Sequence, residues 1–416
     1  SCLFQEEDYF DDSSANRATA DVKRCSELLE AAPNGWVMEY YVGKDYSLGG
    51  ITLLCKFDGQ RVTMASQIAG ADETVSSLYS VKSEQATMLS FDTYNYLVHY
   101  FGQPQGSMAD DPNGTLGGDY EFVISDATAD RIELKGKKYG NRIVMKAFSA
   151  DQTWKQYLTR IKKVEDDAFF YEYDLRMDGL YTGQMLRSNY TFIVTYYDEV
   201  GKVYQKTVPF MFTTDGMRFH EPVTIDGQTM QNFVWKNEEI SFVCTDEGAT
   251  GVKMKGIYID GYQSYDYYPG TYLMDFYRLN GATNQLEVAS QEIQLVKNED
   301  GKSYWLKGLE YDILVTYDKP RGGLSILPQF LKKVQGGYVY LAMWDLMNDY
   351  VLRSSAIGLI SYPTTDGIYL VDNGVWMGEI SGFIFGVYDS QDEEASFMGY
   401  TDAVAAIRLI KKTIEE

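Results

Sequence analysis

Side chains that could act as catalysts near neutral pH are scarce in this chain. Histidine, the commonest general base and a frequent metal ligand, occurs only twice among 416 residues, as His99 and His220. His220-Glu221 begins like the His-Glu-x-x-His motif of zinc proteases, but Thr224 occupies the position of the second histidine, and Pro222 disfavours the required helix. We interpret the match as accidental. We interpret His99 as a hydrogen-bonded core or hinge residue rather than a catalyst.

Motifs for nucleophilic and nucleotide chemistry are also missing. The sequence has no Gly-x-Ser-x-Gly elbow, Walker loop, Gly-x-Gly-x-x-Gly fingerprint or Cys-x-x-Cys pair. Carboxylates are numerous, and glycoside hydrolysis needs only two of them at a suitable separation, so a carboxylate-based hydrolase stays open as an alternative. The acidic loop at residues 110–119 lacks the spacing of a calcium hand, and we favour a hydrated loop there. The sequence predicts no catalytic residue, metal or cofactor.

One segment is dense in tyrosine and is the best candidate for a ligand-binding surface. Aromatic rings that carry a hydroxyl suit sugars or peptides, because the flat face stacks while the polar groups form directional bonds. Packing inside a sheet at a domain boundary is the simpler explanation of the same pattern. The candidate ligand-binding residues are Tyr262, Tyr265, Tyr267, Tyr268 and Tyr272.

A cysteine near the start of the chain indicates where the protein resides. Cys2 follows a small residue, Ser1, and precedes an acidic stretch that includes Glu6, Glu7, Asp8, Asp11 and Asp12. This pattern is typical of a lipoprotein, in which the thiol is acylated and a solvated leader separates the folded part from the membrane. The alternative is a charged tail that happens to contain a cysteine.

The three other cysteines do not indicate a disulfide framework, because acylation of Cys2 would leave an odd number. Cys25 shares a helical face with apolar residues, and Cys55 shares a strand face with them, so both are expected in the core. A bridge between Cys25 and Cys55 remains an alternative. No metal-ligand spacing joins the cysteines.

Composition excludes several classes of partner. With 37 basic and 60 acidic side chains, the formal net charge is −23, which repels nucleic acid and anionic bilayers. No apolar run approaches the length that spans a bilayer, so the predicted membrane attachment is through the lipid on Cys2 alone. The 35 Tyr and 20 Phe favour strand-rich structure.

The periodicity of apolar residues predicts the order of the elements. A helical period covers residues 19–32, and from Trp36 onward the period is two, with turns between short runs. A second helix is expected over residues 151–176. After it the features of the first half recur, for example Phe91 and His99 against Phe212 and His220, which predicts a shared repeat fold. A last strand is expected at residues 400–411.

These observations predict a mainly β protein made of successive antiparallel β-meander units, with an N-terminal helix, a connecting helix and a C-terminal lipocalin-like barrel. In chain order, the expected parts are a flexible acidic leader (1–17), a first helix-plus-β unit (18–150), a connecting helix (151–176), a second, repeat-like β unit (177–260) and a C-terminal barrel-like domain (261–416).

Several strings resemble an uncharacterised family of Bacteroidetes cell-surface lipoproteins of about this length, classed as a domain of unknown function. They are residues 89–101, with Phe91, Asp92, Tyr94, Asn95 and His99, then residues 118–124, 134–138, 210–213 and 219–222, together with the Cys2 leader. The resemblance implies a lipid-anchored outer-membrane protein, displayed at the cell surface and associated with nutrient capture. It transfers no catalytic residue.

We therefore expect a non-catalytic binding or scaffold protein that contacts a glycan, a peptide or a neighbouring outer-membrane protein, and not nucleic acid. Two alternatives remain. One is a carboxylate-based hydrolase such as a glycosidase. The other is a carrier that holds a small apolar ligand inside the C-terminal unit.

Overall fold

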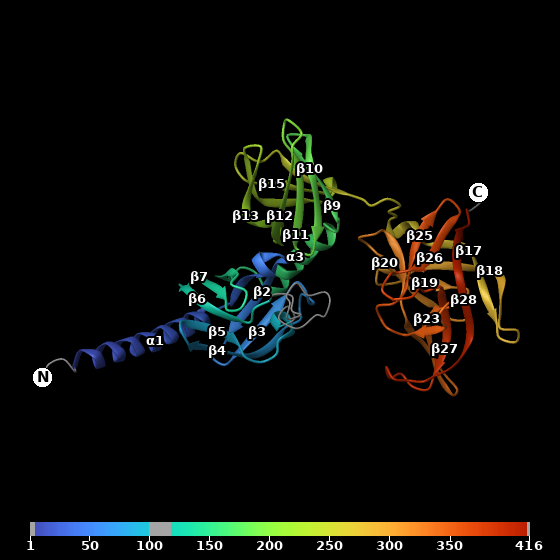
Figure 1. The fold of residues 1–416 in the computed structure, drawn as a ribbon, viewed down its shortest axis with the longest axis horizontal. Coiled ribbons are helices and arrows are strands. Elements are labelled where there is room, and N and C mark those ends of the chain that lie inside the picture. The colour runs from blue at the N-terminus through green and yellow to red at the C-terminus, as the bar shows by residue number, and fades with distance from the viewer. Residues whose placement is uncertain (1–4, 100–117, 414–416) are drawn as a thin grey trace. The chain divides into compact units, whose positions relative to one another are not determined.

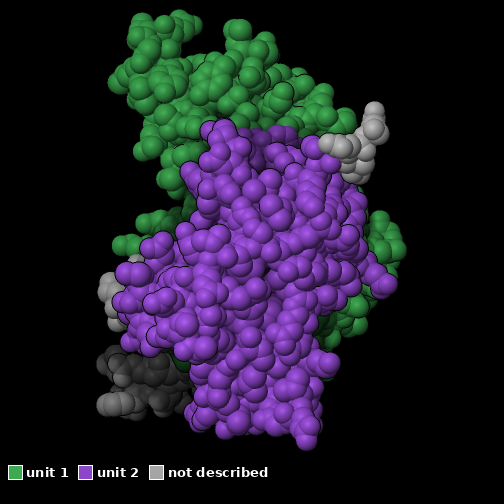
Figure 2. Space-filling model, turned by 90° about the vertical axis from the view of Figure 1, so that its right-hand side faces the viewer, with its two compact units in different colours: residues 1–257 green, residues 258–416 purple. Residues whose placement is uncertain are grey.

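The computed structural model of the protein describes residues 5–99 and 118–413, with side chains of the first helix from residue 14 onward. The chain forms two compact units, which Figure 2 shows in separate colours: an N-terminal unit (residues 1–257) and a C-terminal unit (residues 258–416). Antiparallel strands dominate both, as the sequence predicted. Among the described helices, none combines the length and apolar character needed to cross a bilayer.

The first helix, α1 (Gln5–Ala31), is longer than its apolar period predicted. It includes residues 5–17, which were expected to be a flexible leader. Residues 14–17 are exposed, and only Cys25 and Leu29, near the end, are fully buried, because just the last turns pack against the first sheet. Helical residues without an apolar stripe leave no periodic signal, so the sequence analysis could not detect the first turns.

The helix α3 (Trp154–Asp167) lies between the first two sheets (Figure 1) and ends nine residues before the predicted end at residue 176. That prediction was wrong because residues 172–177 form a strand in which Tyr173, Leu175 and Met177 are buried alternately. The remaining helical segments of residues 5–99 and 118–413 are short: α2 (Tyr96–His99) and the 3-10 turns η1 (Lys44–Tyr46), η4 (Asn237–Glu239) and η5 (Tyr265–Tyr267).

The first sheet is a closed barrel of eight strands in consecutive order, with β1 paired to β8. Its interior is filled by large side chains such as Trp36, Tyr40 and Phe122, which are almost completely buried. The strands are β1 (Trp36–Val42), β2 (Gly49–Phe57), β3 (Arg61–Ser66), β4 (Val75–Ser83), β5 (Thr87–Phe91), β6 (Glu121–Ala127), β7 (Arg131–Gly136) and β8 (Arg142–Ala147).

The second sheet is also a closed barrel of eight consecutive strands, completed by pairing of β9 with β16. Phe192, Phe210, Phe212 and Phe242 fill its interior. The strands are β9 (Glu172–Met177), β10 (Leu180–Ser188), β11 (Thr191–Tyr197), β12 (Val203–Phe212), β13 (Gly216–Ile225), β14 (Gln228–Lys236), β15 (Ser241–Cys244) and β16 (Val252–Ile257).

The two barrels have the same number of strands, and in both the strands follow one another in chain order. The residue pairs matched in the sequence occupy equivalent positions in the two barrels only in part. Phe122 and Phe233 both lie on the sixth strand of their barrel. Phe91, by contrast, ends the fifth strand of the first barrel, whereas Phe212 ends the fourth strand of the second. The equal spacing of these two phenylalanines from His99 and His220 therefore does not mark equivalent positions.

The two barrels contact each other inside the N-terminal unit. The imidazole of His220 packs against the rings of Tyr41 and Tyr46, with centroid distances of 4.3 and 4.0 Å. Beside it, Arg218 of β13 pairs with Glu39 of β1 at 2.5 Å. We call these five residues the barrel seam.

The C-terminal unit has a single sheet of twelve strands in which β28 also pairs with β17, so that eight strands form a closed circuit. The order around the circuit is β17-β18-β19-β20-β21-β25-β26-β28, and β27, β23, β22 and β24 extend the sheet from β28. Buried side chains such as Tyr272, Tyr304 and Ile313 fill the unit.

The strands of this unit are β17 (Gly270–Asn280), β18 (Gln285–Lys297), β19 (Ser303–Lys307), β20 (Ile313–Asp318), β21 (Gly323–Ile326), β22 (Gln329–Val334), β23 (Gly337–Asp345), β24 (Tyr350–Leu352), β25 (Leu359–Thr364), β26 (Gly367–Asp372), β27 (Gly382–Tyr388) and β28 (Phe397–Lys411). β28 includes the strand expected at residues 400–411. Its imperfect alternation has a local cause, because Ala406 has φ +51° and the register with β17 shifts beside it.

Candidate functional site

The tyrosine-rich segment is mainly part of the core of the C-terminal unit. Tyr268 and Tyr272 are 3% and 0% exposed, so these two residues cannot stack on a ligand, contrary to the sequence-based proposal. Their hydroxyls donate to main-chain oxygens: that of Tyr268 to Gly322 at 2.8 Å and that of Tyr272 to Tyr268 at 2.7 Å. Burial raises the pKa of both phenols. These hydrogen bonds satisfy the polar ends of the buried rings.

The other three tyrosines of the segment are more accessible, yet they also pack. The ring of Tyr265 stacks on Tyr304 at 4.7 Å, and its hydroxyl donates to the main-chain oxygen of Ser303. Tyr262 accepts a hydrogen bond from the hydroxyl of Tyr317 at 3.3 Å. Tyr267 is 39% exposed. The segment thus closes one part of the core rather than presenting five rings to solvent.

The described part of the string at 89–101, residues 89–99, forms a local structural clasp. Phe91 is buried in the first barrel, whereas Asp92 and Tyr94 are exposed. The side chain of Asn95 is completely buried, donates to Ser77 Oγ at 3.2 Å and accepts the N–H of Leu97 at 3.1 Å.

His99 completes this clasp. Its Nδ1 accepts the N–H of Asn95 at 3.0 Å, and its Nε2 lies 3.2 Å from the main-chain oxygen of Phe91, to which it donates in the matching tautomer. Both ring nitrogens therefore contact main-chain groups, as expected for a hydrogen-bonded core or hinge residue.

The remaining sequence features give no catalytic cluster among the described residues. His220 and Glu221 lie on strand β13, which cannot form the helical zinc motif. Cys25, Cys55 and Cys244 are free and buried, so the bridge between Cys25 and Cys55 is not formed. No group of three or more His, Cys, Asp and Glu in the described residues is placed to hold a metal ion. Cys2 and residues 110–117 lie outside the described residues.

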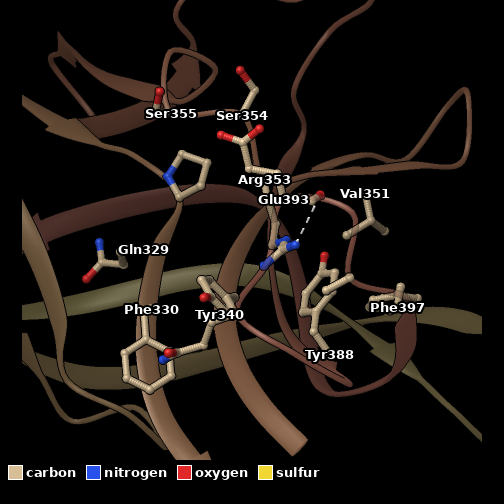
Figure 3. A pocket seen from close by; sticks show the side chains of 13 residues that line it. Gln329, Phe330, Tyr340, Val351, Arg353, Ser354, Ser355, Tyr388, Glu393 and Phe397 are labelled. Atoms are coloured by element: carbon tan, nitrogen blue, oxygen red, sulfur yellow. Dashed lines mark hydrogen bonds between the residues drawn. The ribbon is translucent and has the colours of Figure 1, made fainter.

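A cleft of about 690 Å³ in the C-terminal unit does have the composition of a binding site (Figure 3). It lies where the outer strands β22, β23 and β24 meet the adjoining ends of β27 and β28. Its lining combines aromatic rings with hydroxyl and amide groups: Pro328, Gln329, Phe330, Tyr340, Val351, Arg353, Ser354, Ser355, Tyr388, Gln391, Glu393, Ala395 and Phe397.

Four of these rings form a continuous row of edge-to-face contacts. Phe330 contacts Tyr340 at 5.4 Å, Tyr340 contacts Tyr388 at 5.6 Å, and Tyr388 contacts Phe397 at 5.6 Å. The rings at the two ends are exposed, Phe330 by 44% and Phe397 by 43%. Apolar ring surface is therefore accessible at both ends of the row.

Arg353 covers the middle of the row. Its guanidinium lies 4.5 Å from the ring centroid of Tyr340 and 4.1 Å from that of Tyr388, as cation–π contacts. One Nη atom donates to the main-chain oxygen of Asp392 at 2.7 Å. These contacts hold the guanidinium in one place. The bond to Asp392 uses one of the five N–H donors of the arginine.

The charge around the cleft disfavours anionic ligands. The loop at residues 389–394, which contributes Gln391 and Glu393 to the lining, has the sequence Asp-Ser-Gln-Asp-Glu-Glu. Glu393 is the only carboxylate among the lining residues, whereas hydrolysis of a glycosidic bond ordinarily uses two. The site can thus stack and hydrogen-bond a ligand, but its lining lacks a carboxylate pair.

Sequence analysis missed this cleft because its rings are scattered over residues 330–397 and come from four strands. Each ring has the spacing expected of an ordinary strand residue, and only the strand order β22-β23-β27-β28 brings them together. No local signal in the sequence distinguishes them from core aromatics.

Comparison with protein-family models gives two matches, both to domains of unknown function. DUF4302 matches residues 6–237 and DUF4987 matches residues 245–384. The first match covers α1 and nearly all strands of the two barrels, and the second covers most of the C-terminal unit, including most of the cleft residues. A search of curated proteins gives no match. The chain therefore belongs to the DUF4302 family, a domain of unknown function.

Proposed function

We propose that the protein is a non-catalytic glycan-binding lipoprotein, held at the outer membrane by a lipid on Cys2, and that the cleft of the C-terminal unit binds the glycan. The row of rings from Phe330 to Phe397 is the observation that carries this proposal. Sugar rings present flat C–H surfaces that pack on exposed aromatic faces, and their hydroxyls need several donors and acceptors close by. A few polar groups placed among apolar ones are typical of small-ligand sites.

The polar groups of the cleft fit a neutral polyhydroxyl ligand. Ser354, Ser355, Gln329 and Gln391 can each donate and accept, and Arg353 adds donors between the two accessible rings. The acidic loop at residues 389–394 and the net charge of −23 repel anionic sugars. We therefore expect neutral glycans to bind better than uronate-containing or sulfated ones.

The proposal is tested first with substitutions at the two ends of the row. Phe330→Ala and Phe397→Ala should each weaken the binding of a neutral oligosaccharide about fivefold, since loss of an aromatic contact costs on the order of 1 kcal/mol. Isothermal titration calorimetry on the full chain, with oligosaccharides chosen from a glycan array, gives the dissociation constants. Tyr362→Ala is a matched control, because Tyr362 is 61% exposed but lies outside the cleft.

Three outcomes would contradict the proposal. Equal binding by the native protein and both cleft variants would place the ligand elsewhere. Release of reducing ends from the oligosaccharide would indicate a hydrolase. Binding of unmodified peptides, but of no glycan, would identify a peptide receptor.

The tether is tested separately. We expect the native protein to carry a diacylglycerol-type modification on Cys2, visible as added mass in intact-mass spectrometry. Cys2→Ser should move the protein from the membrane fraction to the aqueous fraction and leave glycan affinity unchanged, because the cleft lies in the C-terminal unit. Native protein with an unmodified Cys2 would refute the tether without affecting the glycan-binding proposal.

A further inference from the structure

The second barrel is closed at one end of β12 but not along its whole length. β12 pairs with β13 only through Phe210–Phe212, opposite residues 217–219, although each strand has ten residues. Along the rest of its length, β12 pairs with β11 alone, from Val203 to Pro209. In a complete barrel both edges of every strand are paired.

A distortion in β13 coincides with the point where its pairing with β12 ends. Residues 219–222 stand opposite Gln231 alone, because the register with β14 jumps from Arg218 to Val223. A bulge of this kind bends a strand, and beyond Phe210 the β11–β12 and β13–β14 hairpins are no longer paired with each other; β12 and β13 are labelled in the second barrel of Figure 1. Residues 203–207 are consequently all exposed, whereas a strand in a filled barrel buries alternate residues.

The pairing pattern shows which main-chain groups of β12 point to its free edge. The N–H of Phe210 donates to the oxygen of Tyr190, and the N–H of Asp198 donates to the oxygen of Lys202. Because hydrogen-bonded pairs alternate in an antiparallel ladder, Tyr204, Lys206 and Val208 bond β11. The N–H and C=O groups of Val203, Gln205 and Thr207 therefore face away from β11.

The two edges beside the opening differ in chemistry. Pro222, on β13, is exposed and has no N–H, so that edge is blocked as a template for pairing. The free segment of β12 has one proline, Pro209, at the end next to the pairing with β13, so the N–H groups of Val203, Gln205 and Thr207 remain along that edge. Stacked rings of Tyr196 and Tyr204, 5.2 Å apart, lie on one face beside it and would cover an apolar side chain of an added strand.

We propose that the free edge of β12 binds an extended peptide segment of a partner protein by strand addition, with an acidic residue opposite Lys206 and an apolar residue opposite Tyr204. Strand addition uses a row of free main-chain donors and acceptors of this kind. A second copy of this chain is the less suitable occupant, because each copy carries a net charge of −23. This site is separate from the cleft and does not depend on glycan binding.

The test uses the full chain and a fluorescent library of end-blocked octapeptides in which valine or threonine alternates with variable residues, including glutamate. Fluorescence anisotropy should detect binding, strongest for sequences that place glutamate two positions from an apolar residue. N-methylation of alternate amides on one edge of the best peptide should abolish binding, since it removes the donors and leaves composition unchanged. Hydrogen exchange should show new protection at Val203, Gln205 and Thr207.

Gln205→Pro should weaken binding about tenfold or more, because it removes a free N–H without removing a bond to β11. Glu221→Ala, on the opposite edge, is the control and should bind as the native protein does. If Gln205→Pro fails to fold, the proposal is tested by comparing the binding of the N-methylated and the unmodified peptide to the native protein. No binding by any library member, equal binding of the N-methylated form, or a dimer that Gln205→Pro dissolves would overturn the proposal.

Discussion

At the scale of single residues, the strings that the sequence analysis found distinctive have a structural explanation. Asp119 and Gly136 belong to two different strings, and the structure brings them together in the first barrel. The carboxylate of Asp119 accepts the N–H groups of Lys138 at 2.8 Å and Tyr139 at 3.2 Å. Burial raises the pKa of this carboxyl, although the two N–H groups oppose the change. A β carbon on Gly136 would lie only 2.0 Å from Asp119 Oδ2.

We therefore expect Gly136→Ala to lower the free energy of unfolding by about 1–3 kcal/mol, because the carboxylate can move only by giving up its main-chain bonds. Urea denaturation followed by tryptophan fluorescence measures the change. Gly70→Ala is a suitable control, since its β carbon would meet neighbours at 3.5 Å or more, and it should change stability by less than about 0.5 kcal/mol. Equal effects of the two substitutions would disprove this account.

The sequence indicated the chemical role of single residues better than it indicated which of them are buried or lie close together in the fold. The sequence analysis described His99 as a hydrogen-bonded core or hinge residue, and both ring nitrogens do contact main-chain groups. It could not rank the tyrosines, since Tyr268, which is buried, and Tyr267, which is exposed, are neighbours with the same local pattern. The row formed by Phe330, Tyr340 and Tyr388 depends on strand pairing over long sequence distances, which periodicity does not encode.

At the scale of elements, α3 shows how a helix start can be more strongly specified than its end. Thr153 Oγ1 accepts the N–H of Gln156 at 3.1 Å, and the side chain of Gln156 accepts the N–H of Thr153 at 2.9 Å, which is a capping box. Trp154, in the first turn, donates from Nε1 to the main-chain oxygen of Asn34. The start is thus fixed both locally and by tertiary contact.

Thr153→Ala should destabilise the N-terminal unit by about 1 kcal/mol through loss of this cap. The same substitution at Thr159, an exposed interior position of the same helix, should be neutral or stabilising by a few tenths of a kcal/mol, because alanine has the higher helix propensity. Thermal unfolding by circular dichroism compares the two. A loss at Thr159 as large as that at Thr153 would show that the cap is not the cause.

The predicted end of α3 was wrong because apolar residues continue past Asp167 with a spacing that fits either a helix or a strand over a short window. Ala168 and Phe170 are both buried although neither is helical, and the period of two becomes clear only from Tyr173 onward. Similarly, the kink at Ala406 made the last strand look irregular. Boundaries and bulges are decided by neighbouring strands, and these are not adjacent in the sequence.

At the scale of the whole molecule, the barrel seam makes the stability of the N-terminal unit depend on pH. Burial lowers the pKa of His220, while the nearby carboxylates of Glu221 and Glu39 partly oppose the shift and Arg218 adds to it. The unfolded chain binds a proton at His220 near pH 6.5, but the folded chain binds it only at lower pH. Stability from this group is therefore complete above about pH 6.5 and is lost as the pH falls below that value.

His220→Gln should remove this part of the pH dependence. We expect the native protein to lose more stability than the variant between pH 7.5 and pH 5, measured as the difference in urea midpoints at each pH. Because the carboxylates are common to both proteins, their contribution cancels in the comparison. A variant with the same loss as the native protein would show that His220 is not the group that titrates.

The closure of each barrel by its own first and last strands has a mechanical consequence. Trp36, at the start of β1, lies opposite Ala147, at the end of β8, and Glu172 of β9 lies opposite Ile257 of β16 in the same way. A force applied to the chain on either side of a barrel therefore loads the closing ladder at one end and peels it pair by pair, instead of shearing all its bonds at once. If the protein is tethered through Cys2 as proposed, a pulling force would open the barrels at modest tension, and the strands could pair again once the force is released.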